Sequence, residues 1–164
     1  MLTAGAIAPA GPNDRRQVMV GLGLTVLAAV AAAGSSTIHI HLWATGYKHL
    51  PTIGPLFLMQ SISGWLLAVI LVVARRSVLV PLAAAGFLVS TAAGMVLSAE
   101  VGLFGFKDSF SAPWAKTSLA IELAGALIAM SAAALQWRRQ GDIGLSAAVA
   151  RLRPGRATPT SAAH

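Results

Sequence analysis

The chain has 164 residues, of which 56% are hydrophobic and 10% are charged, with a net charge of +7. Soluble domains carry about one quarter charged residues, so this composition indicates a membrane protein. In a membrane protein, basic groups beside apolar segments favour anionic lipids over nucleic acid as their partner. The absence of cysteine excludes disulfide frameworks, thiol redox relays, iron–sulfur clusters and cysteine-ligated zinc.

The elements in chain order predict an all-α, integral membrane four-helix bundle. Residues 1–16 are rich in Ala, Gly and Pro, and we expect a disordered tail. Residues 17–137 form one domain, because four segments are long and apolar enough to cross hydrocarbon about 30 Å thick, and lipid forces them into helices. These spans are residues 18–41, 56–73, 79–101 and 114–137.

The C-terminal residues 138–164 form a basic tail. Within it, Leu145, Val149 and Leu152 recur at helical spacing beside two arginines. This pattern predicts a short amphipathic helix on the membrane surface.

The basic residues divide between the two sides of the predicted spans. The arginines on one side are Arg15, Arg16, Arg75, Arg76, Arg138, Arg139, Arg151, Arg153 and Arg156. The lysines on the other side are Lys48, Lys107 and Lys116. The positive-inside rule therefore predicts a multi-pass protein of the plasma membrane with both termini in the cytoplasm.

One alternative concerns the first span. Arg15 and Arg16 before an apolar run also resemble a twin-arginine signal, whose cleavage would leave three spans. Because three further spans follow, we favour a permanent anchor.

Small residues recur every four positions along the third span. They are Gly86, Ser90, Gly94, Ser98 and Gly102. Such series let helix backbones approach closely, and in lipid this contact drives association. We expect this face to pack against a helix of the same chain or of another copy.

Polar side chains gather in the half of the spans nearer the lysines. They include His39, His41, Gln60, Glu100, Ser118 and Glu122. The opposite half is mostly Ala, Val, Leu and Ile, so the pattern indicates a one-sided pocket or hydrated vestibule, not a polar path across the bilayer.

Glu122 is the most informative of these residues. It lies eight positions after Trp114, about 12 Å into the helix, and the small residues on its face point it toward the bundle. An ionisable group there is costly and by default marks function. It could carry a proton, pair with a cation or bind a metal. The structural alternative is a neutral acid hydrogen-bonded to Ser118, Gln60 or a backbone carbonyl. Glu100 lies nearer the interface and is expected to be solvated.

The stretch IHIHLWATGYKHLPTIGP, residues 38–55, contains three of the four histidines. His39 and His41 lie about 200° apart on a helix, so one helix cannot aim both at one ion. A metal site built from His41, Glu122 and Glu100 is a speculative interpretation. A histidine–acid hydrogen bond and simple interfacial placement are the alternatives, and no cofactor is predicted.

The stretch HLWATGYKHLPTIGPLFLMQ, with VGLFGF between the third and fourth spans, resembles small four-span membrane proteins of high-GC Gram-positive bacteria. The resemblance covers most of residues 18 to 137. It implies a four-span fold and brings no catalytic residues. The small multidrug-resistance exporters also have four spans and one membrane acid, but theirs lies in the first span and Glu122 lies in the fourth.

These features favour a non-enzymatic membrane protein acting as a structural or accessory subunit, in a homo-oligomer or a larger membrane complex. The alternative is a proton- or cation-coupled carrier with Glu122 as the binding acid and His41 as a modulator. A metal- or haem-binding protein is less favoured. An enzyme is disfavoured because the sequence lacks a nucleophile motif, paired acids at a fixed spacing and a glycine-rich phosphate loop.

Overall fold

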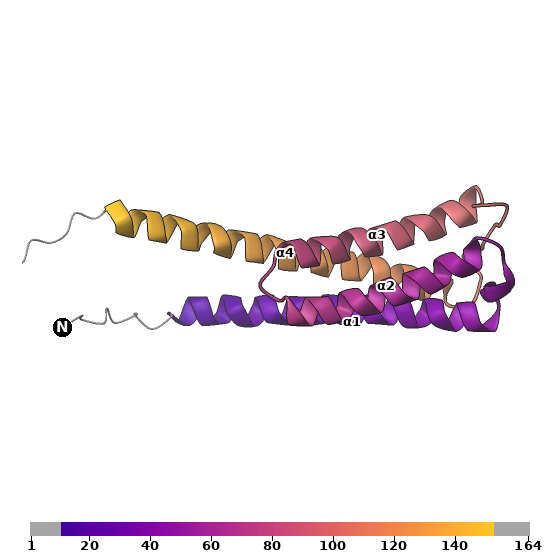
Figure 1. The fold of residues 1–164 in the computed structure, drawn as a ribbon, viewed down its shortest axis with the longest axis horizontal. Coiled ribbons are helices and arrows are strands. Elements are labelled where there is room, and N and C mark those ends of the chain that lie inside the picture. Colours follow the sequence, from indigo (N-terminus) through magenta and orange to yellow (C-terminus); the bar gives the residue numbers. More distant parts are fainter. Residues whose placement is uncertain (1–10, 153–164) are drawn as a thin grey trace, which may run out of the picture.

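The chain folds into four long helices and one short 3₁₀ turn (Figure 1), in a computed structural model that describes residues 11–152. Their bounds are α1 Pro12–Thr45, η1 Tyr47–His49, α2 Ile53–Val73, α3 Leu79–Glu100 and α4 Ala115–Leu152. Each long helix contains a segment long and apolar enough to cross a membrane. The prediction of a multi-pass, all-helical membrane protein is therefore confirmed, while its orientation stays a prediction.

The boundaries of α1 and α2 depart from the predicted spans, and α1 also ends at Thr45, four residues later than predicted. α1 begins at Pro12, inside the predicted tail 1–16, because proline suits the first turn of a helix. α2 begins at Ile53, three residues before the predicted start, because Pro55 falls in the first turn, where no N–H is needed. α3 occupies Leu79–Glu100, almost as predicted.

α4 differs most from its prediction. It begins at Ala115 and continues without a break to Leu152. Residues 138–152 are thus helical, but they extend α4 and do not form the separate surface helix that the apolar spacing predicted. The rest of the predicted tails, residues 1–10 and 153–164, lies outside the described residues.

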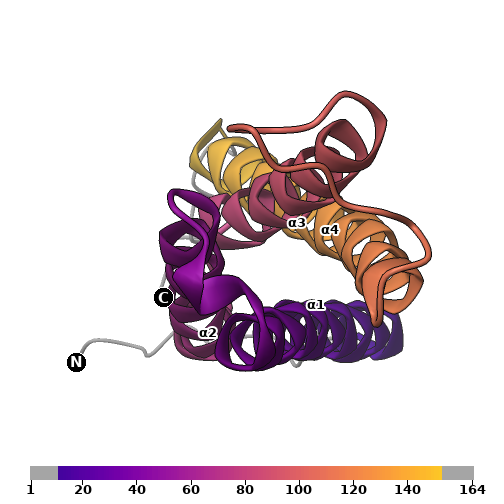
Figure 2. The same ribbon diagram turned by 90° about the vertical axis from the view of Figure 1, so that its right-hand side faces the viewer.

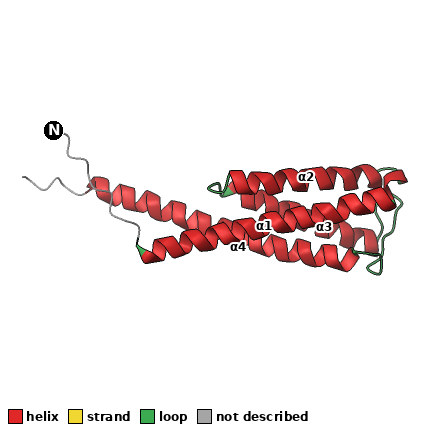
Figure 3. Cartoon of the chain, turned by 90° about the horizontal axis from the view of Figure 1, so that it is seen from below, coloured by secondary structure: helices red, strands yellow, loops and turns green. Residues whose placement is uncertain are grey.

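The four helices form a bundle with two different ends (Figures 2 and 3). The connections 46–52 and 101–114 lie together at one end, here called the double-loop end. The turn 74–78 lies at the opposite end, here called the terminal end, where α1 and α4 extend beyond α2 and α3. α1 packs mainly against α2 and α4, and α3 packs mainly against α4.

The core on the terminal side of the bundle consists almost wholly of small side chains. Its buried members are Ala28, Ala29, Ala32, Ala68, Leu71, Ala84, Ala85 and Ala129. A methyl group on every helix lets the backbones come close, which favours association in lipid through van der Waals contact. Gly125 of α4 lies close to α1, because an added Cβ would lie 2.5 Å from the Cβ of Ala31.

The first part of the small-residue series of α3 does not pack against another helix of the described chain, whereas Ser98 is buried. Gly86 and Ser90 are exposed, and a Cβ added at Gly86 or Gly94 would meet nothing within 4 Å. α3 instead buries residues such as Ala84 and Leu88, which lie two positions away and thus about 200° around the helix. Packing of the series against another copy stays a prediction.

The last member of that series is not helical. Gly102 follows the end of α3 and has φ of +83°, a conformation that L side chains rarely adopt. Its role is therefore in the turn that starts the α3–α4 loop.

Two glutamines of α4 close the terminal end. Gln136 Nε2 donates to the carbonyl of Arg75 at 3.1 Å, and Gln140 Nε2 donates to the carbonyl of Arg76 at 3.2 Å. These carbonyls follow the end of α2 and have no partner within a helix. The side chains therefore tie α4 to the α2–α3 turn.

Candidate ligand-binding cavity

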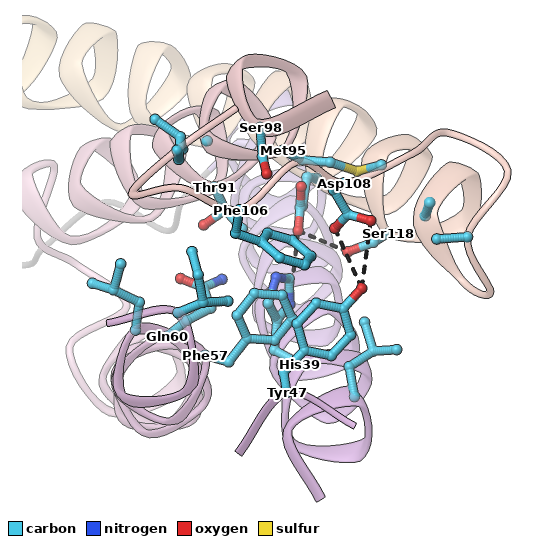
Figure 4. Close-up of a pocket in the computed structure, with 18 of the residues that line it drawn as sticks. His39, Tyr47, Phe57, Gln60, Thr91, Met95, Ser98, Phe106, Asp108 and Ser118 are labelled. Atoms are coloured by element: carbon cyan, nitrogen blue, oxygen red, sulfur yellow. Dashed lines mark hydrogen bonds and ion pairs between the residues drawn. The ribbon is translucent and has the colours of Figure 1, made fainter. Parts of the chain in front are cut away.

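A cavity of about 230 Å³ lies at the double-loop end, lined by all four helices and both loops (Figure 4). It reaches from the loop residues Tyr47, Phe106 and Asp108 down to Glu122. Beyond Glu122, toward the terminal end, the alanine core described above fills the bundle. The polar half and the apolar half predicted from the sequence thus correspond to a cavity and to a packed core.

Glu122 forms the deepest polar group of the cavity. Its side chain is fully buried, and its Oε1 accepts hydrogen bonds of 2.8 Å from the hydroxyls of Ser35 and Ser118. Its Oε2 is buried without a hydrogen-bond partner among the described residues. One carboxyl oxygen is thereby held in place by α1 and α4, and the other is available to a proton or to a ligand.

His39 is the basic group nearest to this carboxyl. Its Nδ1 lies 2.9 Å from the carbonyl of Ser35 and 4.0 Å from Glu122 Oε1. A carbonyl only accepts, so Nδ1 carries the hydrogen, and the longer distance to Glu122 is no hydrogen bond. The contact orients the imidazole beside the acid and leaves Nε2 without its proton in the neutral ring.

Three aromatic rings line the cavity above His39. The rings of Tyr47 and Phe57 stack at 4.5 Å between centroids, and Phe106 meets Tyr47 edge-on at 5.6 Å. His39 lies 5.0 Å from Phe57. The rings come from η1, α2 and the α3–α4 loop, so their contacts join this loop to η1 and α2, which precede it by about fifty residues in the sequence (Figure 4).

A tight turn places Phe106 in this group. Leu103 and Phe106 exchange backbone hydrogen bonds of 2.7 and 2.8 Å across Phe104 and Gly105, which both have positive φ. This is the geometry of a type I′ turn, in which glycine at the second central position is favoured. The fragment VGLFGF therefore folds back over the cavity.

Tyr47 also makes a polar contact across the mouth of the cavity. Its hydroxyl lies 3.4 Å from both carboxyl oxygens of Asp108, and the amide of Asp108 donates to the carbonyl of Ser98 at 3.2 Å. Burial raises the pKa of Tyr47 above its ordinary value of 10, and the charge and hydrogen bond of Asp108 raise it further. The phenol proton of Tyr47 is needed for this hydrogen bond, so the two connections of the double-loop end are joined only while Tyr47 is protonated.

Two further polar atoms of the cavity lining lack partners within the described chain. Gln60 Nε2 on α2 and Ser98 Oγ on α3 are buried and make no hydrogen bond. Together with Glu122 Oε2, they offer polar contacts from three different helices. Buried polar groups are usually satisfied, so their convergence on one cavity indicates a ligand or ordered water there.

The structure brings together four of the residues singled out in the sequence and separates two others. His39, Gln60, Ser118 and Glu122 line the cavity. His41 is exposed, with its ring 6.3 Å from that of Trp114, and Glu100 is exposed at the end of α3. Neither lines the cavity.

The helix geometry explains why His39 and not His41 lies beside the acid. α1 continues unbroken to Thr45, so the two histidines point in different directions. His41 is exposed and does not line the cavity that contains Glu122. Among residues 11–152, no group of three or more His, Asp or Glu side chains is arranged to hold a metal ion.

Sequence reasoning missed Ser35, Tyr47, Phe106 and Asp108 as parts of the site. Ser35 precedes His39 by four residues, so a shared helix face was predictable. Asp108 lies in the loop between α3 and α4, and only the folding of this loop toward η1 places it beside Tyr47.

No protein-family model, curated protein or solved structure matches this chain. The function is therefore argued from the membrane-spanning fold and from the cavity.

Proposed function

We propose that this protein is a non-enzymatic membrane carrier that binds a small organic cation at Glu122 in exchange for a proton. The observation that carries the proposal is the unpartnered Oε2 of a fully buried carboxyl at the floor of an open cavity. Acids within spanning segments are costly and commonly mark ion or substrate pathways.

The chemistry of the lining supports a cationic ligand. A carboxylate supplies the opposite charge, and the faces of aromatic rings attract organic cations through their quadrupoles. Tyr47, Phe57 and Phe106 provide such rings between Glu122 and the double-loop end. Apolar side chains, including Leu42 and Met95, line the rest and suit a hydrocarbon body.

Exchange with a proton follows from the isolation of the acid. Among the described residues, the basic side chain at ion-pair distance from Glu122 is His39, at 4.0 Å and engaged with a backbone carbonyl. A bare carboxylate in apolar surroundings costs several kcal/mol, so the empty site favours a proton on the acid. A cation that binds at Oε2 therefore displaces that proton.

The one-sided cavity supports a carrier rather than a continuous channel. The cavity opens toward the double-loop end, and buried alanines of all four helices occupy the other half. If the predicted orientation holds, the described conformation faces outward. Transport then requires a second conformation in which the small-residue contacts rearrange.

The test uses the full chain in lipid nanodiscs with 2-phenylethylammonium as the probe, measured by titration calorimetry in buffers that differ in ionisation enthalpy. We expect binding with release of about one proton per ligand, and loss of both in Glu122→Gln. Glu100→Gln removes an exposed acid outside the cavity and should bind normally. Unchanged binding and proton release in Glu122→Gln would refute the proposal.

A second candidate is the accessory-subunit role favoured by the sequence. The observation that supports it is the exposed, unfilled face of α3 at Gly86 and Ser90. Native mass spectrometry after mild detergent extraction would show a larger complex, which Gly86→Leu would dissociate. A homo-oligomer or monomer without other subunits would refute this role.

A further inference from the structure

The cavity reaches the outer surface of the bundle in the middle of α3. Ser90 lines the cavity and is exposed, and Gly86, one turn away on the same face, is exposed and has no neighbour near its Cβ position. Ser90 lies ten or more residues from either end of Leu79–Glu100, or about 15 Å along the helix axis. An opening at this position lies at the depth of the hydrocarbon.

The neighbouring side of the opening belongs to α2. Leu56 lines the cavity and is 42% exposed, while a Cβ at Gly94 of α3 would meet nothing within 4 Å. Figure 2 shows α2 and α3 lying apart at the double-loop end. On this side of the cavity, between α2 and α3, the lining residues Leu56 and Ser90 are exposed, and together with Gly94 they are here called the lateral opening.

The size of the cavity limits what can be enclosed. Sites that enclose drug-sized ligands have volumes of about 300–1,000 Å³, and this cavity has about 230 Å³. It holds a headgroup and a few carbon atoms. A ligand with a longer apolar part must leave that part outside, and the lateral opening places it in the hydrocarbon.

Two buried oxygen atoms of the cavity lining, one on α3 and one on α4, select the chemistry of the headgroup. Glu122 Oε2 and Ser98 Oγ can both accept hydrogen bonds and have no other partner in the described chain. A primary ammonium has three N–H donors, whereas a quaternary ammonium has none. Building on the proposed role of Glu122, we propose that the cavity binds the head of a single-chain primary amine that enters from the bilayer through the lateral opening.

The experiment compares amphiphiles of one chain length with a short amine. The probes are dodecylamine, dodecyltrimethylammonium and 2-phenylethylammonium, added to the full chain in phosphatidylcholine nanodiscs and detected by native mass spectrometry. Ser90→Trp fills the lateral opening. Ser131→Trp, at an exposed position of α4 outside the cavity, is the matched control, and Gly94→Leu is a second blocking variant.

We expect the wild-type protein to bind dodecylamine at least about tenfold more tightly than dodecyltrimethylammonium, a difference that one charge-assisted hydrogen bond supplies. Ser90→Trp and Gly94→Leu should weaken dodecylamine binding by about tenfold or more, while Ser131→Trp leaves it unchanged. In Ser90→Trp and Gly94→Leu the loss of dodecylamine binding should exceed any loss of 2-phenylethylammonium binding, because the short amine needs no room in the lateral opening.

The outcomes separate this inference from the proposed function. Binding of 2-phenylethylammonium without binding of dodecylamine would overturn the lateral route and leave the cation site intact. Equal binding of dodecylamine by Ser90→Trp, Gly94→Leu and the wild type would also overturn it. Failure of every amine to bind the wild type would refute the cation site itself.

Discussion

Substitution of Gly125 by alanine tests the close approach of α4 to α1. In the structure, a Cβ at Gly125 would lie 2.5 Å from the Cβ of Ala31 and 2.9 Å from Cδ1 of Leu88. Carbon atoms prefer separations of about 3.5–4.0 Å, so the helices must move apart by about 1 Å. Overpacking of this kind typically costs about 1–3 kcal/mol.

The matched control is Gly94→Ala. Both glycines lie within helices, so alanine contributes the same gain in helix propensity, about 1 kcal/mol, at each position. At Gly94 the added methyl group would meet nothing within 4 Å. The difference in unfolding free energy between the two variants therefore isolates the steric cost, and Gly125→Ala should be less stable by about 1–3 kcal/mol.

The assay is thermal unfolding of both variants in the same mild detergent, followed by the fluorescence of the four tryptophans. For a chain of this size, the expected difference corresponds to roughly 2–12 °C in Tm. If Gly125→Ala were as stable as Gly94→Ala, the close contact between α1 and α4 would be refuted. A lower stability of Gly94→Ala would instead favour the small-residue face of α3 as the main packing surface.

Two further predictions concern the cavity and its mouth. The chain has one tyrosine, so the ultraviolet absorbance titration of phenol groups reports Tyr47 alone. Because burial and Asp108 raise the pKa of Tyr47, the midpoint of this titration should lie above 10. The free energy of unfolding should be retained below about pH 10 and should fall as pH rises through that midpoint. Asp108→Asn should lower the midpoint toward 10, and a wild-type midpoint at or below 10 would contradict the contact. Ser35→Ala removes one of the two hydrogen-bond donors to Glu122 and should lower the unfolding free energy by about 1 kcal/mol. The hydroxyl of Ser131 bonds only within its own helix, so Ser131→Ala should change the unfolding free energy by less than about 0.5 kcal/mol. Equal effects of the two substitutions would argue against the buried contact between Ser35 and Glu122.

The number and placement of the spans were predictable because the hydrocarbon imposes a length and an apolar composition on each helix. The third span was accurate to one residue at its C-terminal end, where Glu100 is the last helical residue and Gly102 begins the turn. α4 was predicted too short, since the window of apolar residues ends near Trp137 but the backbone stays helical to Leu152. Hydropathy indicates where a helix can leave the membrane, not where the helix itself ends.

The site was predictable in its deepest part and not at its mouth. Glu122 was identified because an ionisable side chain within a membrane span is costly and by default marks function. The choice between His39 and His41 depended on whether α1 remained helical to Thr45, which local sequence did not decide. Tyr47, Phe106 and Asp108 meet only through the folded loops, and no spacing rule relates residues 61 positions apart.

The sequence by itself determined that this is an all-helical membrane protein with four spans, one polar half and one deep acid, because hydropathy and charge act locally and additively along the chain. Only the tertiary structure decided which faces meet. It left Gly86 and Ser90 of α3 exposed, brought Gly125 of α4 close to α1, and left Oε2 of Glu122 without a partner beside a cavity. Small side chains permit close packing on several faces, and only the crossing of the four helices decides which of those faces is used.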